Sequence, residues 1–224
     1  MAAVQVFPEE NVDKVEEFTR VRVNGKDLNL TLLMQADELA PLFSGAAWAD
    51  PSNSLRVIEL GAGIGVPGMA ARVAGAKHVI LTEQDELLRL MHVNLAANAE
   101  EDGDEKGGIV ARPLSWGVQQ TNEYLAQYPD EKVDVVLSCD CIYEPLYGTS
   151  WRALAQTMER LCLANPKCIV LMGVERRNQD GIDKFLAFVD TDTKLQYRLD
   201  EQTFGTNKNR LEVYYLGLET ESRD

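Results

Sequence analysis

Short apolar runs recur along most of the chain, and segments with helical periodicity separate them. From Leu55 onward the runs LRVIEL, HVILTE, IVARPL, VDVVLS and KCIVLMG have the length and the branched side chains of buried strands. The intervening segments are compatible with helices, and in residues 84–100 four apolar side chains share one helical face: Leu87, Leu88, Met91 and Leu95. This alternation predicts βαβ units, and therefore a doubly wound α/β fold with a mostly parallel sheet.

Both ends of the chain depart from this alternation. Residues 18–30, FTRVRVNGKDLNL, alternate about an Asn24-Gly25 pair, which is the strongest short-range signal of a β-hairpin. A short helix is expected from Thr31 to Phe43. Near the other end, KLQYRL and LEVYYLGL have the pattern of two strands separated by a polar turn, which is compatible with an antiparallel edge on the parallel sheet.

Length and composition favour one domain. The chain has 224 residues and a hydrophobic content of 45%, which is enough for a single well-buried core. We expect one domain over residues 1–224, in which residues 1–45 form a hairpin-and-helix extension and residues 55–218 form the ligand-binding core. We find no internal repeat and no low-complexity linker in the sequence.

The charge balance narrows the expected partners. The chain carries 22 Lys and Arg against 36 Asp and Glu, which gives a formal charge of −14. Such a chain repels nucleic-acid phosphates and anionic lipids, so we expect no nucleic-acid or membrane partner and favour basic protein surfaces or cationic ligands. The sequence shows no secretory signal pattern and no apolar run of membrane-spanning length. We therefore expect a soluble, cytoplasmic monomer.

Cysteine and histidine usage argues against a metal site. The chain has four cysteines in no C-x-x-C arrangement and only two histidines, so neither a zinc site nor a disulfide framework is expected. Reduced thiols packed as small hydrophobic groups are the preferred interpretation for Cys139, Cys141, Cys162 and Cys168. The motifs of serine hydrolases, zinc peptidases and P-loop proteins are also absent from the sequence.

Residues 56–68, RVIELGAGIGVPG, lead from a predicted strand into a glycine loop. From Gly63 the sequence satisfies G-x-G-x-x-G, and Glu83 follows about 20 residues later at the end of the next predicted strand. This spacing is compatible with a dinucleotide, and also with a turn that needs glycine only for close packing. Glu59 favours a different ligand, because a carboxylate beside the loop opposes a pyrophosphate but attracts the ammonium and sulfonium groups of S-adenosylmethionine.

This arrangement resembles the first cofactor motifs of class I methyltransferases, which use S-adenosylmethionine. The resemblance implies a Rossmann-like, seven-stranded sheet. It also implies that Glu59 faces the methionine end of the cofactor, that the glycines admit the cofactor backbone, and that Glu83 holds the ribose.

Three downstream motifs narrow the resemblance. LSWG (residues 114–117) follows the third core strand, and the fourth strand leads into Asp140-Cys-Ile-Tyr143, a D-x-x-Y motif. Together with GVERR (residues 173–177), these motifs resemble the seven-stranded protein-lysine methyltransferases, a family that includes enzymes acting on chaperone-type ATPases and translation elongation factors. The likeness covers most of residues 28–173. It implies methyl transfer to an exposed lysine of such a protein.

The resemblance also implies the site residues. Asp140 would orient the lysine amine, and Tyr143 would supply an aromatic wall for the lysine stem. Asp140 also stabilises the ammonium form of that amine, so it is a doubtful sole base. Met34 stands where the family has a tryptophan. The residues implied for cofactor binding are Glu59, Gly61, Ala62, Gly63, Gly65, Glu83, Gln84, Ser115, Trp116, Cys139 and Met34.

Other interpretations of these residues stay open. The alternatives are that Asp140 is only a turn residue, that Trp116 and Tyr143 are only packing residues, and that Glu175 and Arg176 form only a surface ion pair. A small-molecule methyltransferase is the alternative among enzymes. A non-catalytic module that binds a partner protein through an acidic face is the alternative from another functional class.

Overall fold

The computed structural model describes residues 18–23, 26–31, 55–74, 76–98, 108–200 and 211–219. For the first two ranges and for residues 73–74 the description covers only the backbone. The helix expected from Thr31 to Phe43 lies outside the described residues, except that Thr31 itself ends a strand. Met34 also lies outside them.

The centre of the fold is one sheet with the strand order β5-β4-β3-β6-β7-β9-β8. Strands β3 to β7 are parallel to one another, and β9 runs antiparallel to both β7 and β8. The predicted parallel sheet with an antiparallel edge is therefore confirmed. The strand bounds are β3 Arg56–Leu60, β4 His78–Glu83, β5 Ile109–Pro113, β6 Val135–Cys139, β7 Ile169–Glu175, β8 Leu195–Leu199 and β9 Leu211–Leu218.

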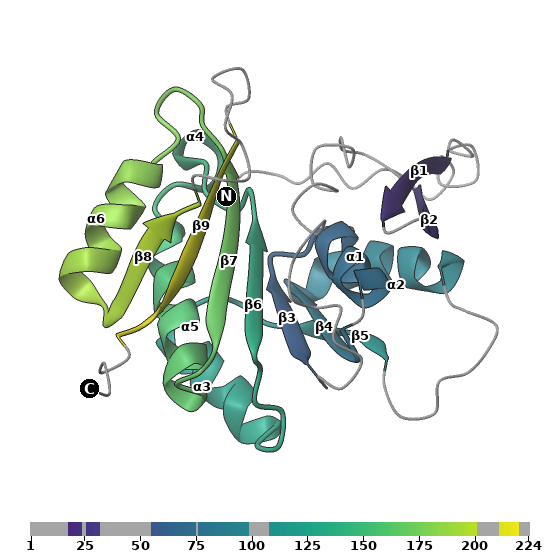
Figure 1. The fold of residues 1–224 in the computed structure, drawn as a ribbon, viewed down its shortest axis with the longest axis horizontal. Helices are drawn as coiled ribbons and strands as arrows, with labels where there is room; N and C mark the ends of the chain where they lie inside the picture. Colours follow the sequence, from purple (N-terminus) through teal and green to yellow (C-terminus); the bar gives the residue numbers. More distant parts are fainter. Residues whose placement is uncertain are drawn as a thin grey trace.

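Helices cover both faces of this sheet, as the doubly wound prediction requires (Figure 1). Helices α1 and α2 pack on one face, whereas α3, α5 and α6 pack on the other. No helix among the described residues has the length and apolar character needed to span a bilayer. The helical elements are α1 Val66–Ala74, η5 Asp85–Leu87, α2 Leu88–Ala97, α3 Val118–Gln127, α4 Glu144–Tyr147, α5 Trp151–Ala164 and α6 Ile182–Asp192.

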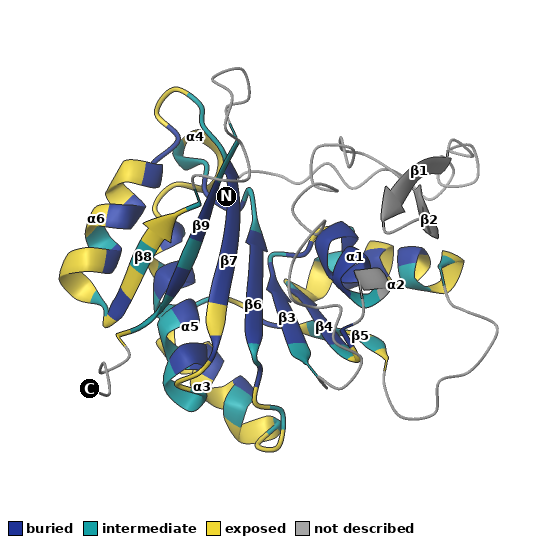
Figure 2. Cartoon of the chain, in the orientation of Figure 1, coloured by how far each residue is buried: buried dark blue, intermediate teal, exposed yellow. Residues whose placement is uncertain are grey.

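The central strands are buried on both faces, which explains their nearly continuous apolar sequence (Figure 2). In β3, Ile58 and Leu60 belong to the core beneath α5 and α6. Val57 belongs to the core beneath α1 and α2, and alternation along the strand places Glu59 on that same face. The direction in which Glu59 points is therefore set by its position in the strand.

The predicted N-terminal hairpin is confirmed. Strands β1 (Phe18–Val23) and β2 (Lys26–Thr31) pair antiparallel, with Val23 opposite Lys26. The hairpin lies against α1 and α2 rather than joining the main sheet (Figure 1).

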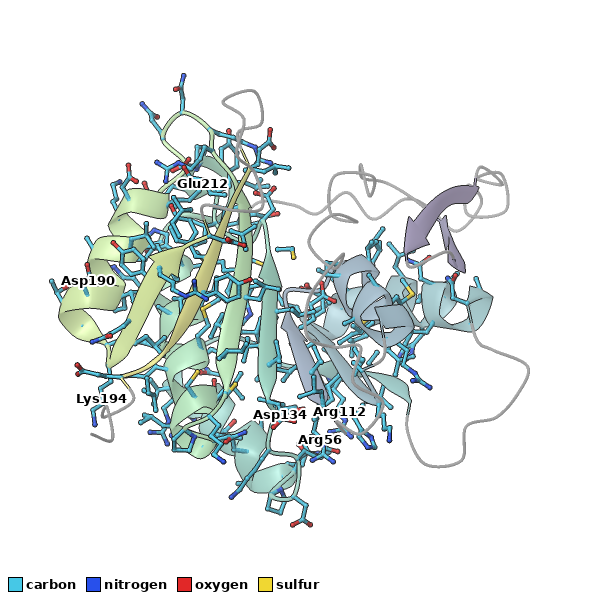
Figure 3. All side chains as sticks on the ribbon, in the orientation of Figure 1. Arg56, Arg112, Asp134, Asp190, Lys194 and Glu212 are labelled. Atoms are coloured by element: carbon cyan, nitrogen blue, oxygen red, sulfur yellow. The ribbon has the colours of Figure 1, made fainter. Side chains whose placement is uncertain are left out.

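Arg56 and Asp134 lie near one end of the sheet, and Glu212 lies near the other (Figure 3). At the amino ends of β3 and β6, the Arg56 backbone N–H donates to Asp134 Oδ2 at 2.9 Å, and the Arg56 guanidinium donates to the Asp130 carbonyl at 2.6 Å. These contacts hold neighbouring strands together. Glu212, on β9, lies beside the carboxyl end of β7, because it is opposite Val174. The glycine loop, LSWG, the D-x-x-Y motif and GVERR all lie at the carboxyl ends of parallel strands.

Candidate active site

The carboxyl ends of the parallel strands meet at one edge of the sheet. From β3 the chain continues to β4 and β5 on one side, whereas β6 and β7 lie on the other side. In open α/β sheets, a ligand crevice forms at such a switch point. Here the switch point brings the glycine loop after β3 beside the D-x-x-Y loop after β6. The loops touch, since Cys141 Sγ lies 3.3 Å from the Leu60 carbonyl.

The glycine loop combines a packed position with an open one. Gly61 has φ +64°, and a Cβ built there would lie 2.8 Å from Cys141 Sγ and 2.8 Å from Trp116 Cζ2. Gly63 has φ +55°, but a Cβ built there would meet nothing within 4 Å. Gly61 is thus required for the contact between loops, whereas Gly63 presents bare, exposed backbone to a ligand. Gly65 also has positive φ and packs close to Leu81.

Glu59 adjoins the glycine loop, as the sequence indicates, but it lies buried beneath the loop. Its side chain is on the α1 face, the residue is only 1% exposed, and Oε2 accepts a 2.8 Å hydrogen bond from the Gly68 N–H. Burial raises the pKa of Glu59 to about 8; the charge of Glu83 adds to this shift, and the hydrogen bond from Gly68 opposes it. Glu59 therefore supports the first turn of α1, and its predicted role at the methionine end stays a prediction.

We expect stability to fall as pH rises from about 4.5 to about 8, because in this window folded Glu59 keeps a proton that the unfolded chain has released. The slope from this residue is at most about 1.4 kcal/mol per pH unit. Glu59→Gln keeps an acceptor for the Gly68 N–H and removes the ionisation, so its free energy of unfolding should fall less steeply with pH. Denaturant unfolding at pH 5, 6.5 and 8 measures this, with exposed Glu86→Gln as the control. Parallel pH dependences in wild type and Glu59→Gln would contradict it.

Glu83 ends β4 directly beside the glycine loop. Its Oε2 accepts a 3.2 Å hydrogen bond from the Gly63 N–H, and its Oε1 accepts a 3.0 Å hydrogen bond from the Gln84 N–H. The carboxylate is half-buried, and each oxygen has a further lone pair for a hydroxyl donor. The structure thus brings Glu83 and the loop together in the arrangement that ribose binding needs.

Trp116 borders the same crevice from the loop after β5. The indole packs on the core beneath α5 and its Cζ2 atom reaches the glycine loop at Gly61. The ring is half-buried, so part of its surface is open to a planar ligand. This position suits a platform for adenine.

Trp116→Ala should weaken S-adenosylmethionine binding by about 1 to 3 kcal/mol, because base-on-aromatic stacking is lost. Trp116→Phe should retain much of the affinity, since it keeps a flat apolar surface. Isothermal titration calorimetry measures both. If both variants bind normally and only melt earlier, Trp116 is a core residue.

Four of the five remaining candidates also lie at this edge, and the fifth, Met34, lies outside the described residues. Ala62 is buried, and its N–H donates to the Thr82 carbonyl at 2.9 Å. Gln84 and Ser115 are exposed at the ends of β4 and β5. The Cys139 carbonyl is 3.4 Å from Cys141 Sγ, and burial raises the pKa of the Cys139 thiol well above its usual value. Cys139 is therefore a thiol, not a reactive thiolate.

Asp140 has an unusual backbone, and both oxygens of its carboxylate accept hydrogen bonds. Its φ is +51°, a left-handed conformation that Asp tolerates better than most residues. Arg177 Nη1 donates to Oδ1 at 3.1 Å, and Arg177 Nη2 donates to Oδ2 at 2.6 Å. The Glu175 N–H also donates to Oδ1, at 3.3 Å. Asp140 is thus held in place from β7 and the loop that follows it.

Arg177 is the site residue that sequence reasoning missed. It lies in the GVERR segment, but the motif by itself does not show which arginine faces Asp140. The Arg177 Cζ atom lies 5.2 Å from the centroid of the Tyr143 ring, so a cation already contacts both ends of the D-x-x-Y motif. Arg177 also pairs with Glu175.

The alternative interpretation that Glu175 and Arg176 form an ion pair is wrong. Arg176 points to the other side of the segment, where it pairs with Asp183 at 2.8 Å and lies near Asp180 and Glu212. Because adjacent residues leave β7 in opposite directions, only Arg177 reaches the crevice.

The match to a protein family identifies the chain. A family model described as lysine methyltransferase matches residues 32–192. The chain belongs to the lysine methyltransferase family. The matched region includes the glycine loop, Glu83, LSWG, the D-x-x-Y motif and GVERR.

The chain is similar to several proteins that have different names. "Secreted RxLR effector protein 48" of Plasmopara viticola is 76% identical over 159 residues, which are 69% of this chain and 81% of that protein. "Protein N-lysine methyltransferase METTL21A" of Danio rerio is 30% identical over 159 residues, or 71% of this chain and 64% of the relative. "EEF1A lysine methyltransferase 3" of Xenopus tropicalis is 32% identical over 130 residues, or 58% and 51%. The matched region therefore spans less than two thirds of the length of the last two relatives.

Solved structures support the fold. The ribosomal protein L11 methylase of Lactobacillus delbrueckii subsp. bulgaricus has a TM-score of 0.52 at 21% identity, covering 83% of this chain and 80% of that one. TYW2 of P. horikoshii, solved in complex with MeSAdo, has a TM-score of 0.52 at 14% identity, covering 91% and 72%.

S-adenosylmethionine is the cofactor of this methyltransferase fold, and the residues present fit it. Exposed Gly63 leaves room for the cofactor backbone, Glu83 offers carboxylate oxygens to a ribose, and Trp116 offers a planar surface. Each of these groups comes from a different strand end, and all border the switch-point crevice. The assignment of single contacts stays a prediction.

Proposed function

We propose that this protein transfers a methyl group from S-adenosylmethionine to the side-chain amine of a lysine in a protein substrate. The contact between the two loops carries the proposal, because Cys141 joins the glycine loop to the loop that bears Asp140 and Tyr143. A cofactor cradle and an anionic group for an amine therefore share one crevice. Family membership supports lysine as the acceptor class.

The residues around the crevice serve alignment rather than covalent catalysis. The bound cofactor supplies a methyl group on a sulfonium; the amine nitrogen forms the new bond to carbon as the carbon–sulfur bond breaks, and the product ammonium releases one proton. Asp140 accepts a hydrogen bond from the amine and directs its lone pair, and Tyr143 lines the path of the lysine stem. Before transfer, the lysine ammonium loses a proton to water, because only the neutral amine has a lone pair with which to attack.

The proposed substrate is a protein with a basic surface around the target lysine. The formal charge of −14 attracts such a surface over long range. The name of the Xenopus relative supports translation elongation factor 1A as the first candidate. A chaperone-type ATPase is the second candidate, and it rests only on the sequence resemblance.

We also propose that the protein acts as a monomer in the cytoplasm. Its cysteines are all free thiols, which suits a reducing compartment. The Plasmopara viticola relative is named as a secreted protein, so the compartment is a separate question from the chemistry. Cell fractionation with an antibody to the native chain addresses it.

Labelling tests the proposed function. The purified protein is incubated with cofactor labelled on the methyl group and with a dialysed protein extract, and the labelled proteins are hydrolysed to amino acids. We expect label in methylated lysine, and the labelled protein is then purified and its modified residue identified by mass spectrometry. Recombinant elongation factor 1A is assayed in parallel.

The same experiment separates the rival functions. Label confined to small metabolites supports a small-molecule methyltransferase. Cofactor binding without any transfer supports a non-catalytic module. Methylated arginine, glutamine or histidine in place of lysine overturns the proposed substrate class.

A further inference from the structure

The Asp140 carboxylate keeps one acceptor position open. A carboxylate has about four lone-pair sites, two on each oxygen. Oδ1 accepts from Arg177 Nη1 and from the Glu175 N–H, whereas Oδ2 accepts from Arg177 Nη2 alone. The side chain of Asp140 is 26% exposed, so an incoming donor can reach it. An amine can therefore bind to Oδ2 while Arg177 stays in place.

Arg177 is held there by its own backbone. Its N–H donates to Asp180 Oδ2 at 2.9 Å, and Asp180 is only 4% exposed. Asp180 Oδ1 accepts from the Ile182 N–H at the start of α6, and the Asp180 carbonyl accepts from the Glu144 N–H of α4. The loop after β7 is thus fastened to both helices, and the Arg177 guanidinium is held by Asp140 and Glu175.

The chemistry of the acceptor explains why a fixed cation is useful. A lysine attacks only as the neutral amine, but a lone carboxylate beside it favours the ammonium form. A carboxylate paired with a guanidinium offers less charge to an ammonium than a lone carboxylate does, even though Arg177 also pairs with Glu175, and its free lone pair still accepts a hydrogen bond. When paired with Arg177, Asp140 can therefore align the amine without strongly favouring its protonated form.

We propose that Arg177 is a positioning residue that neutralises Asp140, so that Asp140 aligns the acceptor amine without holding it as an ammonium ion. The inference rests on the proposed function. Arg177 acts through Asp140 and needs no contact with the methyl group.

Other ionisable groups face this pair from every neighbouring element. Two thiols and one phenol do not ionise near neutral pH, because burial raises the pKa of Cys139, of Cys141 (to about 12) and of Tyr147. Glu59 titrates within the pH range of the assay. All the variants retain Glu59, so the Arg176→Gln control shows its contribution without any change at Arg177. The groups around the pair are Glu175, Asp180, Tyr143, Tyr147, Cys139 and Cys141, with Glu59 and Glu83 on the cofactor side.

The pH dependence of kcat tests this role, with saturating cofactor and saturating acceptor protein purified from the labelling experiment. Arg177→Gln removes the cation, Arg177→Lys keeps the charge without the two-pronged geometry, and Arg176→Gln removes a cation from the adjacent residue. Each variant is assayed from pH 6.5 to 9.5, and its melting temperature is checked. The kcat profile reports ionisations in the complex with substrate.

We expect Arg177→Gln to move the acid limb of the kcat profile upward by about one to two pH units. Its kcat at pH 7 should then fall at least about tenfold and recover toward pH 9.5. Its KM for the acceptor should not rise. Arg177→Lys should restore most of the profile, and Arg176→Gln should show none of the shift.

Two results would overturn the inference while leaving lysine methylation intact. An equal loss of kcat at every pH would assign Arg177 a purely structural role. An increase of kcat/KM at neutral pH would show that Arg177 blocks the acceptor site. If the wild-type protein and Arg176→Gln label no lysine, the proposed function fails, and this inference fails with it.

Discussion

Asp140→Asn is expected to lower methyl transfer by about 100-fold or more, while S-adenosylmethionine affinity stays near the wild-type value. Asparagine suits the left-handed backbone of Asp140, so the loop should keep its shape. The amide replaces one acceptor oxygen by a donor. It cannot accept from Arg177, from the Glu175 N–H and from the amine at once.

The matched control for Asp140→Asn is Asp183→Asn. Asp183 also pairs with an arginine, Arg176, but its side chain is 82% exposed and lies outside the crevice. This variant should methylate at the wild-type rate. Single-turnover kinetics and calorimetry measure transfer and cofactor binding separately. An Asp140→Asn protein that methylates its substrate at the wild-type rate would remove Asp140 from the site.

Glu83→Ala is expected to weaken cofactor binding by roughly 1.5 to 3 kcal/mol, or about 10- to 150-fold. The substitution removes the charged acceptor for the ribose, and it also releases the Gly63 N–H that shapes the loop. Glu83→Gln keeps an acceptor for that N–H and loses the charge, so it should fall between the wild type and Glu83→Ala. Calorimetry with S-adenosylmethionine measures the series.

Glu86→Ala serves as the control for the Glu83 series. It removes an exposed carboxylate three residues further along the chain, and it should leave cofactor affinity unchanged. Unchanged affinity in a folded Glu83→Ala protein would show that the ribose is held elsewhere. Equal losses in Glu83→Ala and Glu86→Ala would show a general effect of charge.

Local pattern was sufficient for most of the fold. The β6 run reads as continuously apolar because Val135, Val136 and Leu137 face helices on both sides of the sheet. The hairpin was predicted from Asn24-Gly25, because this pair favours a tight turn, and β1 and β2 do pair antiparallel. The glycine loop and Glu83 were found together because a parallel register places the ends of β3 and β4 side by side.

Glu59 shows where a local reading of the site was incomplete. The sequence places it beside the glycine loop, and it does adjoin the loop in the fold. Strand alternation, however, turns its side chain beneath α1, where burial keeps it protonated near neutral pH. The preference for S-adenosylmethionine over a dinucleotide was inferred from the charge of Glu59. The fold buries that side chain away from solvent.

By itself, the sequence determined the class of fold, the edge of the sheet that carries the site, and the residues at each strand end, because these depend on short-range periodicity and turn chemistry. Tertiary structure alone decided that β9 inserts between β7 and β8, and that Arg177 rather than Arg176 pairs with Asp140. Both features join segments far apart in the chain. The pairing depends on how the loop after β7 is fastened by Asp180, and no local pattern encodes the direction in which a side chain then points.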